Sequence, residues 1–515
     1  PSLRVMISTS WCTKSIDSES SKRKSFVNFI IFCLLFSITH ATVDGVLAYS
    51  AAELGVDIGS DAGFTLYLFY TFSSLFLAKP VLYFASAKTG VVFGLIGLLI
   101  YVSSFFIALL LGNMAKVIFV SGAAFGGIGA GILWTSQGSY YTINAEIYSR
   151  LSFLSDVTVL NNFAAIFSVF YLSFETGFKL LATLVFYLNE KGHNGPSHSW
   201  RPVVFGLYTI SSFIAVVSFY LFTDSFQHTT DNKAIVIDTT VLHPMHSNKE
   251  DFDHSNTSQH TLINEQPKNL THTEYRRIFL QEALAVSRGF YSSRILRLLI
   301  PYQICFGLSA GLIDTYINGV IVKTHIGDGF IGLLSGINTL AAVLSAGPYA
   351  WLCNRYPKWG KWTVMVGGGV CFLFAAIPLL MLSDETIAQW PFIVFYFVVH
   401  GAARGAWENT NKSVVAEYFT DQSQRQAAFA MVYFSSGLAG AMGYLTFKFM
   451  SKIQLALLNV VASCLAIICY HGSFVEFQRD VNRNRNMDRN SIVDERSDIP
   501  NGYSQVSRNE MSDLS

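Results

Sequence analysis

Charged residues are scarce in this chain. Asp, Glu, Lys and Arg make up 13% of its 515 residues, about half the share that is typical of soluble proteins. The formal net charge is only +1, so the overall charge gives no indication of a nucleic-acid partner. Hydrophobic residues reach 51%, with 43 phenylalanines among them. This composition excludes an ordinary soluble protein and is typical of a chain that a lipid bilayer organises.

The common motifs of catalytic, metal and nucleotide sites are also missing. The seven cysteines include no CxxC pair, which argues against a zinc site or a disulfide framework. No Gly-rich loop followed by Lys-Ser/Thr, no HExxH and no GxSxG occurs. The glycines from Gly122 to Gly131 lie inside an apolar run, where small residues favour close helix packing. We therefore expect no enzyme activity, no metal and no cofactor.

What the chain does contain is a series of long apolar runs. A helix needs about 20 apolar residues to cross the hydrocarbon core, and twelve runs approach or exceed that length. They are 26–48, 64–83, 90–111, 117–141, 160–187, 202–222, 296–322, 330–352, 362–382, 391–411, 427–447 and 453–472. Helices fit better than strands, because lipid offers no partner to an unpaired backbone group. We predict an all-α membrane protein of about twelve transmembrane helices.

The apolar runs divide the chain into five parts. These are an N-terminal segment (1–25), a six-helix half (26–222), a linker (223–295), a second six-helix half (296–472) and a tail (473–515). Linker and tail are polar, so we expect both to be largely disordered. Only 275–287 has the pattern of a short amphipathic helix.

Basic residues indicate how the chain lies in the membrane. Lys and Arg gather at 22–24 and at 355–361, whereas 53–61 holds three acids and no base. Because positive residues favour the cytoplasmic side, we expect both termini and the linker to be cytoplasmic. Lys448 and Lys452 fall in a predicted outer gap and count against this orientation. The sequence does not distinguish the plasma membrane from an internal membrane.

The two halves repeat certain residues at a nearly constant separation of 267 to 273 positions. The matched residues are Asp44 with Asp314, Pro80 with Pro348, Lys88 with Arg355, and Trp134 with Trp407. The shared separation favours a duplication of six helices in parallel orientation.

Two short stretches around tryptophan carry a resemblance to a known family. One is GAARGAWENTNK, from Gly401 to Lys412, and the other is GILWTSQGSY, from Gly131 to Tyr140. They resemble signature stretches of the unc-93-like family within the major facilitator superfamily. The resemblance implies a major facilitator fold whose first, fourth, seventh and tenth helices line a central cavity. It also implies three alternative roles: an accessory subunit of a potassium channel, a protein of receptor trafficking, or a solute or ion transporter.

The chain departs from the superfamily pattern at the turn after the second helix of each half. The superfamily motif places an acid immediately before a base there. This chain has Ala87 before Lys88 and Asn354 before Arg355. Both acids are missing, which predicts that the usual gating salt bridge is absent and weakens the case for ordinary transport cycling.

Charged and polar residues inside the apolar runs are our candidate functional residues, because a charge in the membrane costs about 3 kcal/mol. For a substrate or ion pathway they are His40, Asp44, Gln137, Asp314, Asn318 and Arg404. For ion pairs they are Glu175, Lys179 and Glu408. Most of the pathway candidates fall on the helices that the resemblance places around the cavity.

Spacing suggests how some of these residues act. His40 and Asp44 are four residues apart and share a helix face, which fits either a proton-binding site or a structural hydrogen bond. Glu175 and Lys179 have the same spacing and favour a self-contained ion pair. Asp314 shares a face with Asn318 and has no basic neighbour within a turn, which favours binding of a cation or proton.

Arg404 and Glu408 are four residues apart and fit an ion pair. Arg404 also fits a site for an anionic group, and we expect Lys412 to lie already at the membrane interface.

We therefore predict a multi-pass membrane protein that transports a small solute or ion. The alternative is a non-transporting accessory protein that regulates a potassium channel or receptor trafficking. Its expected partners are the lipid bilayer, an unknown solute or ion, and in the alternative a channel or receptor.

Overall fold

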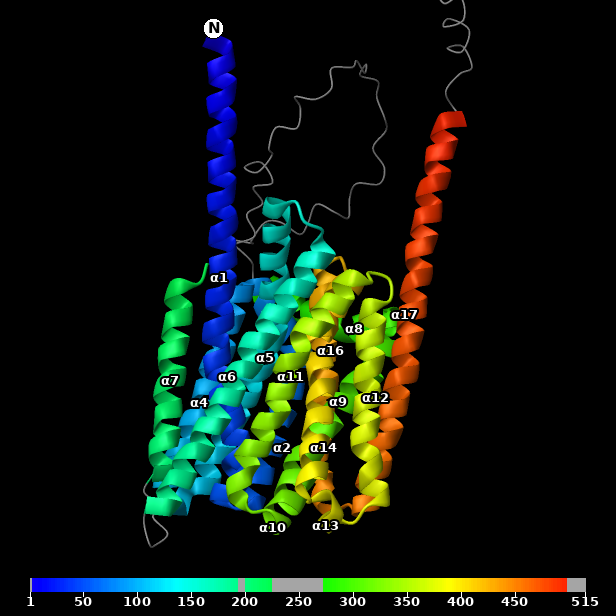
Figure 1. Ribbon diagram of the computed structural model, residues 1–515. Helices are drawn as coiled ribbons and strands as arrows, with labels where there is room; N and C mark the ends of the chain where they lie inside the picture. Colours follow the sequence, from blue (N-terminus) through cyan, green and yellow to red (C-terminus); the bar gives the residue numbers. More distant parts are fainter. Residues whose placement is uncertain (1, 193–199, 225–271, 498–515) are drawn as a thin grey trace, which may run out of the picture.

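The computed structural model of the protein describes residues 2–192, 200–224 and 272–497, and every element in these ranges is a helix. The long helices run side by side as one bundle (Figure 1). This confirms the predicted all-α membrane fold. Residues 1, 193–199, 225–271 and 498–515 lie outside the described ranges, and they include most of the predicted linker and the end of the predicted tail.

The N-terminal half follows the predicted runs closely. Its helices are α1 (Ser2–Leu54), α2 (Val56–Phe76), α3 (Ala78–Phe84), α4 (Ala87–Leu110), α5 (Ala115–Ser152), α6 (Asp156–Gly192) and α7 (Trp200–Phe222). The second run is broken, because α2 and α3 meet at an angle of 49°. The break lies just before Pro80, whose ring removes a backbone donor from the helix.

The C-terminal half contains two π-helical segments, η3 (Ile313–Val322) and η5 (Ala406–Asn411). Its seventh predicted run is α9 (Arg294–Leu312), η3 and α10 (Lys323–His325), and its tenth is α14 (Trp390–Gly405), η5 and α15 (Lys412–Tyr418). The others are α11 (Ile331–Arg355), α12 (Gly360–Met381), α16 (Gln422–Thr446) and α17 (Lys452–Ser497), with the short helix α13 (Asp384–Ile387) before α14. Such π-helical segments occur frequently at functional sites.

Ten helices in the described ranges are long and apolar enough to cross a membrane, and the bent pair α2 and α3 brings the number to eleven. The helix formed by α14, η5 and α15 is not among them, although it runs through the bundle beside the others (Figure 1). It carries Arg404, Glu408 and Lys412, which lower its hydropathy. These charges point to the site described below.

Two segments are helical where we expected mostly disorder, and a third continues a membrane helix into the N-terminal segment. α1 is helical from Ser2, α17 continues to Ser497, and α8 (His272–Ser292) forms within the predicted linker. A helix that the apolar run has already nucleated extends at low cost, since each added residue gains a hydrogen bond. The sequence pattern at 275–287 therefore identified part of α8, whereas the polar extensions of α1 and α17 went unrecognised.

The two halves pack mainly through α6 against α11 and α2 against α16. Glycines permit the close approaches inside the N-terminal half. A Cβ atom on Gly127 would lie 2.2 Å from the carbonyl oxygen of Leu66, and one on Gly131 would lie 2.6 Å from the backbone nitrogen of Ser74. The glycine-rich run of α5 therefore serves helix packing, as predicted.

We name the ends of the bundle by their elements. The linker end holds α8 and the end of α11, and the far end holds α10 and α13 (Figure 1). α1 and α17 both extend beyond the bundle at the linker end.

Candidate functional site

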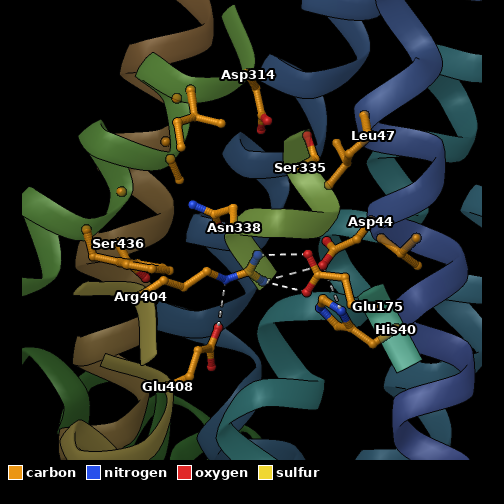
Figure 2. A pocket seen from close by; sticks show the side chains of 18 of the residues that line it. His40, Asp44, Leu47, Glu175, Asp314, Ser335, Asn338, Arg404, Glu408 and Ser436 are labelled. Atoms are coloured by element: carbon orange, nitrogen blue, oxygen red, sulfur yellow. Dashed lines mark hydrogen bonds and ion pairs between the residues drawn. The ribbon is translucent and has the colours of Figure 1, made fainter. Parts of the chain in front are cut away.

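A cavity of about 170 Å³ lies between the two halves. Residues of α1, α2, α5 and α6 line it from the N-terminal half, and residues of α9, η3, α11, α14, η5 and α16 line it from the C-terminal half. Its charged and imidazole-bearing lining residues are His40, Asp44, Glu175, Lys179, Asp314, His400, Arg404 and Glu408. Figure 2 shows how most of these side chains converge from different helices.

Arg404 joins the two halves across this cavity. Its Nη1 and Nη2 atoms donate to the two carboxylate oxygens of Glu175 at 2.7 and 2.6 Å (Figure 2). Paired hydrogen bonds of this kind are among the strongest charge-assisted contacts. Lys179 donates to the same carboxylate at 2.5 Å. The predicted Glu175–Lys179 pair is therefore present, but Glu175 also binds an arginine 229 residues away.

Asp44 and His40 lie beside this pair. The Oδ2 atom of Asp44 is 3.5 Å from His40 Nδ1 and 3.6 Å from Arg404 Nη2. The imidazole ring of His40 packs against Trp134 and Tyr171. The predicted shared face of His40 and Asp44 is thus observed, and both residues line the cavity.

Glu408 and Lys412 extend the charged contacts toward the linker end. Arg404 Nε lies 3.9 Å from Glu408 Oε1, and Lys412 Nζ lies 3.4 Å from Glu408 Oε2. Lys412, which we expected at the membrane interface, is only 3% exposed and therefore lies inside the bundle. Its ammonium lies 4.9 Å from the ring centre of Trp134 and 4.3 Å from that of Phe167, within the range of cation–π attraction.

We call the connected charged residues the central ion cluster. Its members are Asp44, Glu175, Lys179, Arg404, Glu408 and Lys412. The cluster contains three carboxylates and three bases, so its formal charges balance. Balanced pairing is what permits charges to stay in a low-dielectric interior.

Asp314 lines the same cavity but stands apart from the central ion cluster (Figure 2). Its Oδ2 accepts a hydrogen bond of 2.9 Å from the hydroxyl of Tyr444. In the part of the chain that the structure describes, no Lys, Arg or His lies within ion-pair distance of it. When the histidines are neutral, the balanced central ion cluster and Asp314 together therefore carry one negative charge in excess.

Two of the predicted pathway residues do not line the cavity. Gln137 is fully buried in α5, and neither its amide nitrogen nor its amide oxygen has a hydrogen-bond partner among the described residues. Asn318 donates to Ser335 Oγ at 3.3 Å, and its own Oδ1 has no partner there either. The geometry thus brings together His40, Asp44, Asp314 and Arg404, and leaves Gln137 and Asn318 aside.

Sequence reasoning missed several residues of the site. Tyr444 reaches Asp314 from a helix 130 residues away, and Asn338 forms a 2.8 Å hydrogen bond with His400 Nδ1 across the same cavity. Neither contact leaves a spacing pattern along the chain. His400, in contrast, lies four residues before Arg404 on one helix face, which was a usable signal.

A second polar contact between the halves lies at the linker end, and we call it the amide cluster. Its members are Asn161, Asn162, Asn354 and Ser413. Asn354 accepts from Asn161 at 2.9 Å and donates to Asn162 at 2.8 Å. Asn354 occupies the position of the missing turn acid, so neutral amides connect the halves there in place of a carboxylate.

Comparison with family models gives two matches, one in each half. Residues 57–278 match a family described as "Ion channel regulatory protein UNC-93". Residues 299–481 match the Major Facilitator Superfamily. Together they cover most of both six-helix halves, and they agree with the resemblance of the Trp-centred stretches.

Solved transporters share the fold. The proton:xylose symporter XylE superposes with a TM-score of 0.55 and 12% identity, over 88% of this chain and 95% of its own. The E. coli fucose:proton symporter FucP gives 0.53 and 12%, over 88% and 99%. A bacterial homologue of the iron transporter ferroportin gives 0.56 and 11%, over 88% and 98%. A comparison with curated protein sequences found no match. At these identities the structural likeness concerns the fold alone.

Proposed function

Because this chain is an unc-93-like protein with the major facilitator fold, we propose that it carries a small solute or ion through its central cavity. The observation that supports this most is Asp314, a carboxylate that faces the cavity with Tyr444 as its hydrogen-bond partner and no base within ion-pair distance in the described ranges. An isolated carboxylate in a membrane interior is expensive unless a cation or proton neutralises it.

In this proposal Asp314 binds the transported or coupling cation. The cavity of about 170 Å³ leaves room for a few water molecules or a compact solute beside the ion. Asp44 is the second acidic group of the pathway, since it also faces the cavity and its carboxylate lies 3.5 Å from His40 Nδ1. A small solute would contact Asn338 and Ser335, which present polar atoms between Asp314 and Arg404.

Arg404 has a different role in this proposal from that of an anion-binding group. Its guanidinium already forms paired hydrogen bonds with Glu175 and lies within ion-pair distance of Asp44 and Glu408. We infer that it holds the two halves together in the present arrangement, and that the halves separate at this contact when the cavity opens to the other side.

The proposal is tested by flux into liposomes that contain the purified protein. Asp314→Asn removes the charge and keeps the shape, and we expect it to abolish transport of a cation or of a cation-coupled solute. Glu385→Gln is the matched control, because Glu385 is an exposed acid beside α13 at the far end. Equal flux in both variants would refute the assignment to Asp314.

The second candidate is a protein that regulates a channel without transporting anything itself. Its support is the description of the matching family and the amide cluster where transporters of this fold have an acid. Co-expression with a potassium channel distinguishes the two functions. Regulation predicts a changed channel current that survives Asp314→Asn, whereas the carrier predicts flux by the purified protein alone.

We propose that the linker end is cytoplasmic, which the basic residues at 22–24 and 355–361 support. Two glycosylation sequons begin at Asn256 and Asn269, both outside the described ranges. We expect neither to be modified in cells, because a cytoplasmic linker does not meet the glycosylation machinery. A glycosidase-sensitive mass shift that Asn256→Gln or Asn269→Gln removes would contradict this orientation.

A further inference from the structure

α8 carries a strip of exposed side chains that the central cavity does not use. Arg276, Leu280, Leu284 and Arg288 recur every four residues, so they lie along one side of the helix. Leu280 is 49% exposed and Leu284 51%, and both arginines are exposed as well. A helix side that combines basic residues with exposed leucines is typical of helices that lie on a membrane surface.

The opposite side of α8 packs against the bundle and carries Glu282, the acid in the middle of the helix. Ala283 and Val286 are buried there. Glu282 forms an ion pair with Lys79, with 3.0 Å between the carboxylate oxygen and Nζ. Glu282 is therefore turned away from the strip and neutralised. Glu274, in the first turn, is the only other acid of α8, so the strip itself is basic.

The position of α8 brings this strip to the membrane boundary. Only Ser293 separates α8 from α9, which begins the seventh membrane span at Arg294. α8 also packs against α3 and α16, where two further spans end at the linker end. α8 therefore lies at the end of the bundle where these spans leave the membrane.

We propose that the strip formed by Arg276, Leu280, Leu284 and Arg288, together with the exposed Arg277 next to Arg276, binds anionic lipid headgroups of the leaflet at the linker end. The arginines contact the phosphates, and the leucines lie at the boundary with the acyl chains. A basic residue near an anionic membrane surface strengthens binding by about fivefold. The proposal is independent of whether the protein transports a solute.

The test compares the full-length protein in nanodiscs of phosphatidylcholine alone and of phosphatidylcholine mixed with phosphatidylserine, by hydrogen exchange of the α8 amides. We expect slower exchange in α8 when phosphatidylserine is present, and loss of this difference in Arg276→Gln/Arg277→Gln/Arg288→Gln. The control variant Arg355→Gln/Lys358→Gln/Arg483→Gln removes the same charge from exposed positions outside α8 and should retain the difference.

A lipid-independent exchange rate in the unchanged protein would overturn the proposal. So would an equal loss in the control variant, because the effect would then belong to total charge. A second pair of measurements tests the apolar part of the strip. We expect Leu280→Gln/Leu284→Gln to reduce the protection by phosphatidylserine, and soluble glycerophosphoserine to give none. Full protection by the soluble headgroup would contradict binding of a lipid surface.

Discussion

Two of the polar contacts that join the halves have opposite character. At the centre, the central ion cluster connects them through charges, with Arg404 held by Glu175 at 2.6 and 2.7 Å. At the linker end, the amide cluster connects them through neutral groups. A buried charge that loses its partner is much costlier than an amide, which water can satisfy once the contact opens. The comparison suggests that the linker end separates more easily than the centre.

The largest effect should come from Arg404→Gln. This change leaves Glu175 and Asp44 buried with Lys179 as the remaining base, so we expect it to lower the free energy of unfolding by about 4 kcal/mol. Thermal or denaturant unfolding in mild detergent measures the loss. An unchanged stability would mean that the central contact does not hold the halves together.

Glu175→Gln should have a smaller effect than Arg404→Gln, although both break the same pair. Arg404 still has Asp44 at 3.6 Å and Glu408 at 3.9 Å, and the amide oxygen of the new glutamine can still accept a hydrogen bond from Lys179, so neither base is left without a polar partner. We expect a loss of about 2 kcal/mol in the same unfolding measurement. A loss of stability greater than that of Arg404→Gln would show that Asp44 and Glu408 do not compensate the charge of Arg404.

Asn354→Ala tests the amide cluster. The change removes hydrogen bonds to Asn161 and Asn162, two partners that can turn to water when the contact opens. We expect a loss of about 1 kcal/mol of stability and faster labelling of a cysteine placed at Ala350, which is buried one turn before Asn354. The same cysteine in an otherwise unchanged protein is the control, and equal labelling rates would contradict the role of this contact.

The smallest effect should come from the salt bridge between Arg425 and Glu146, which also joins the halves at the linker end. The carboxylate side is 38% exposed, so solvent screens the pair. Glu146→Gln should cost less than about 1 kcal/mol, and the difference should fade at high salt. A loss of stability that persists at high salt would show that this pair is shielded from solvent, as the central ion cluster is.

The fold could be predicted from the sequence because each membrane span must form its backbone hydrogen bonds internally and remain apolar along its length. Twelve runs met that condition, and each corresponds to helices of the bundle. Polar extensions were harder to recognise, since the 473–497 segment is helical without any apolar signal.

The site could be predicted from the sequence only where its residues are neighbours on one helix. His40 with Asp44 and Glu175 with Lys179 follow from a spacing of four. Arg404 with Glu175 and Asp314 with Tyr444 depend on how distant helices pack, and no local pattern encodes them. This is why the sequence offered only Glu408 as an ion-pair partner of Arg404, whereas the structure places the stronger contact with Glu175.

The central claim is that Asp314 binds a cation in the cavity. Thermal unfolding of the purified protein against a panel of cations and pH values, for the unchanged protein and for Asp314→Asn, tests it most directly. A cation that binds only the folded state stabilises it by about 2.7 kcal/mol at a hundredfold excess over Kd. We predict such a rise for at least one cation or for protons, and its absence in Asp314→Asn. An equal rise in both proteins would contradict the claim.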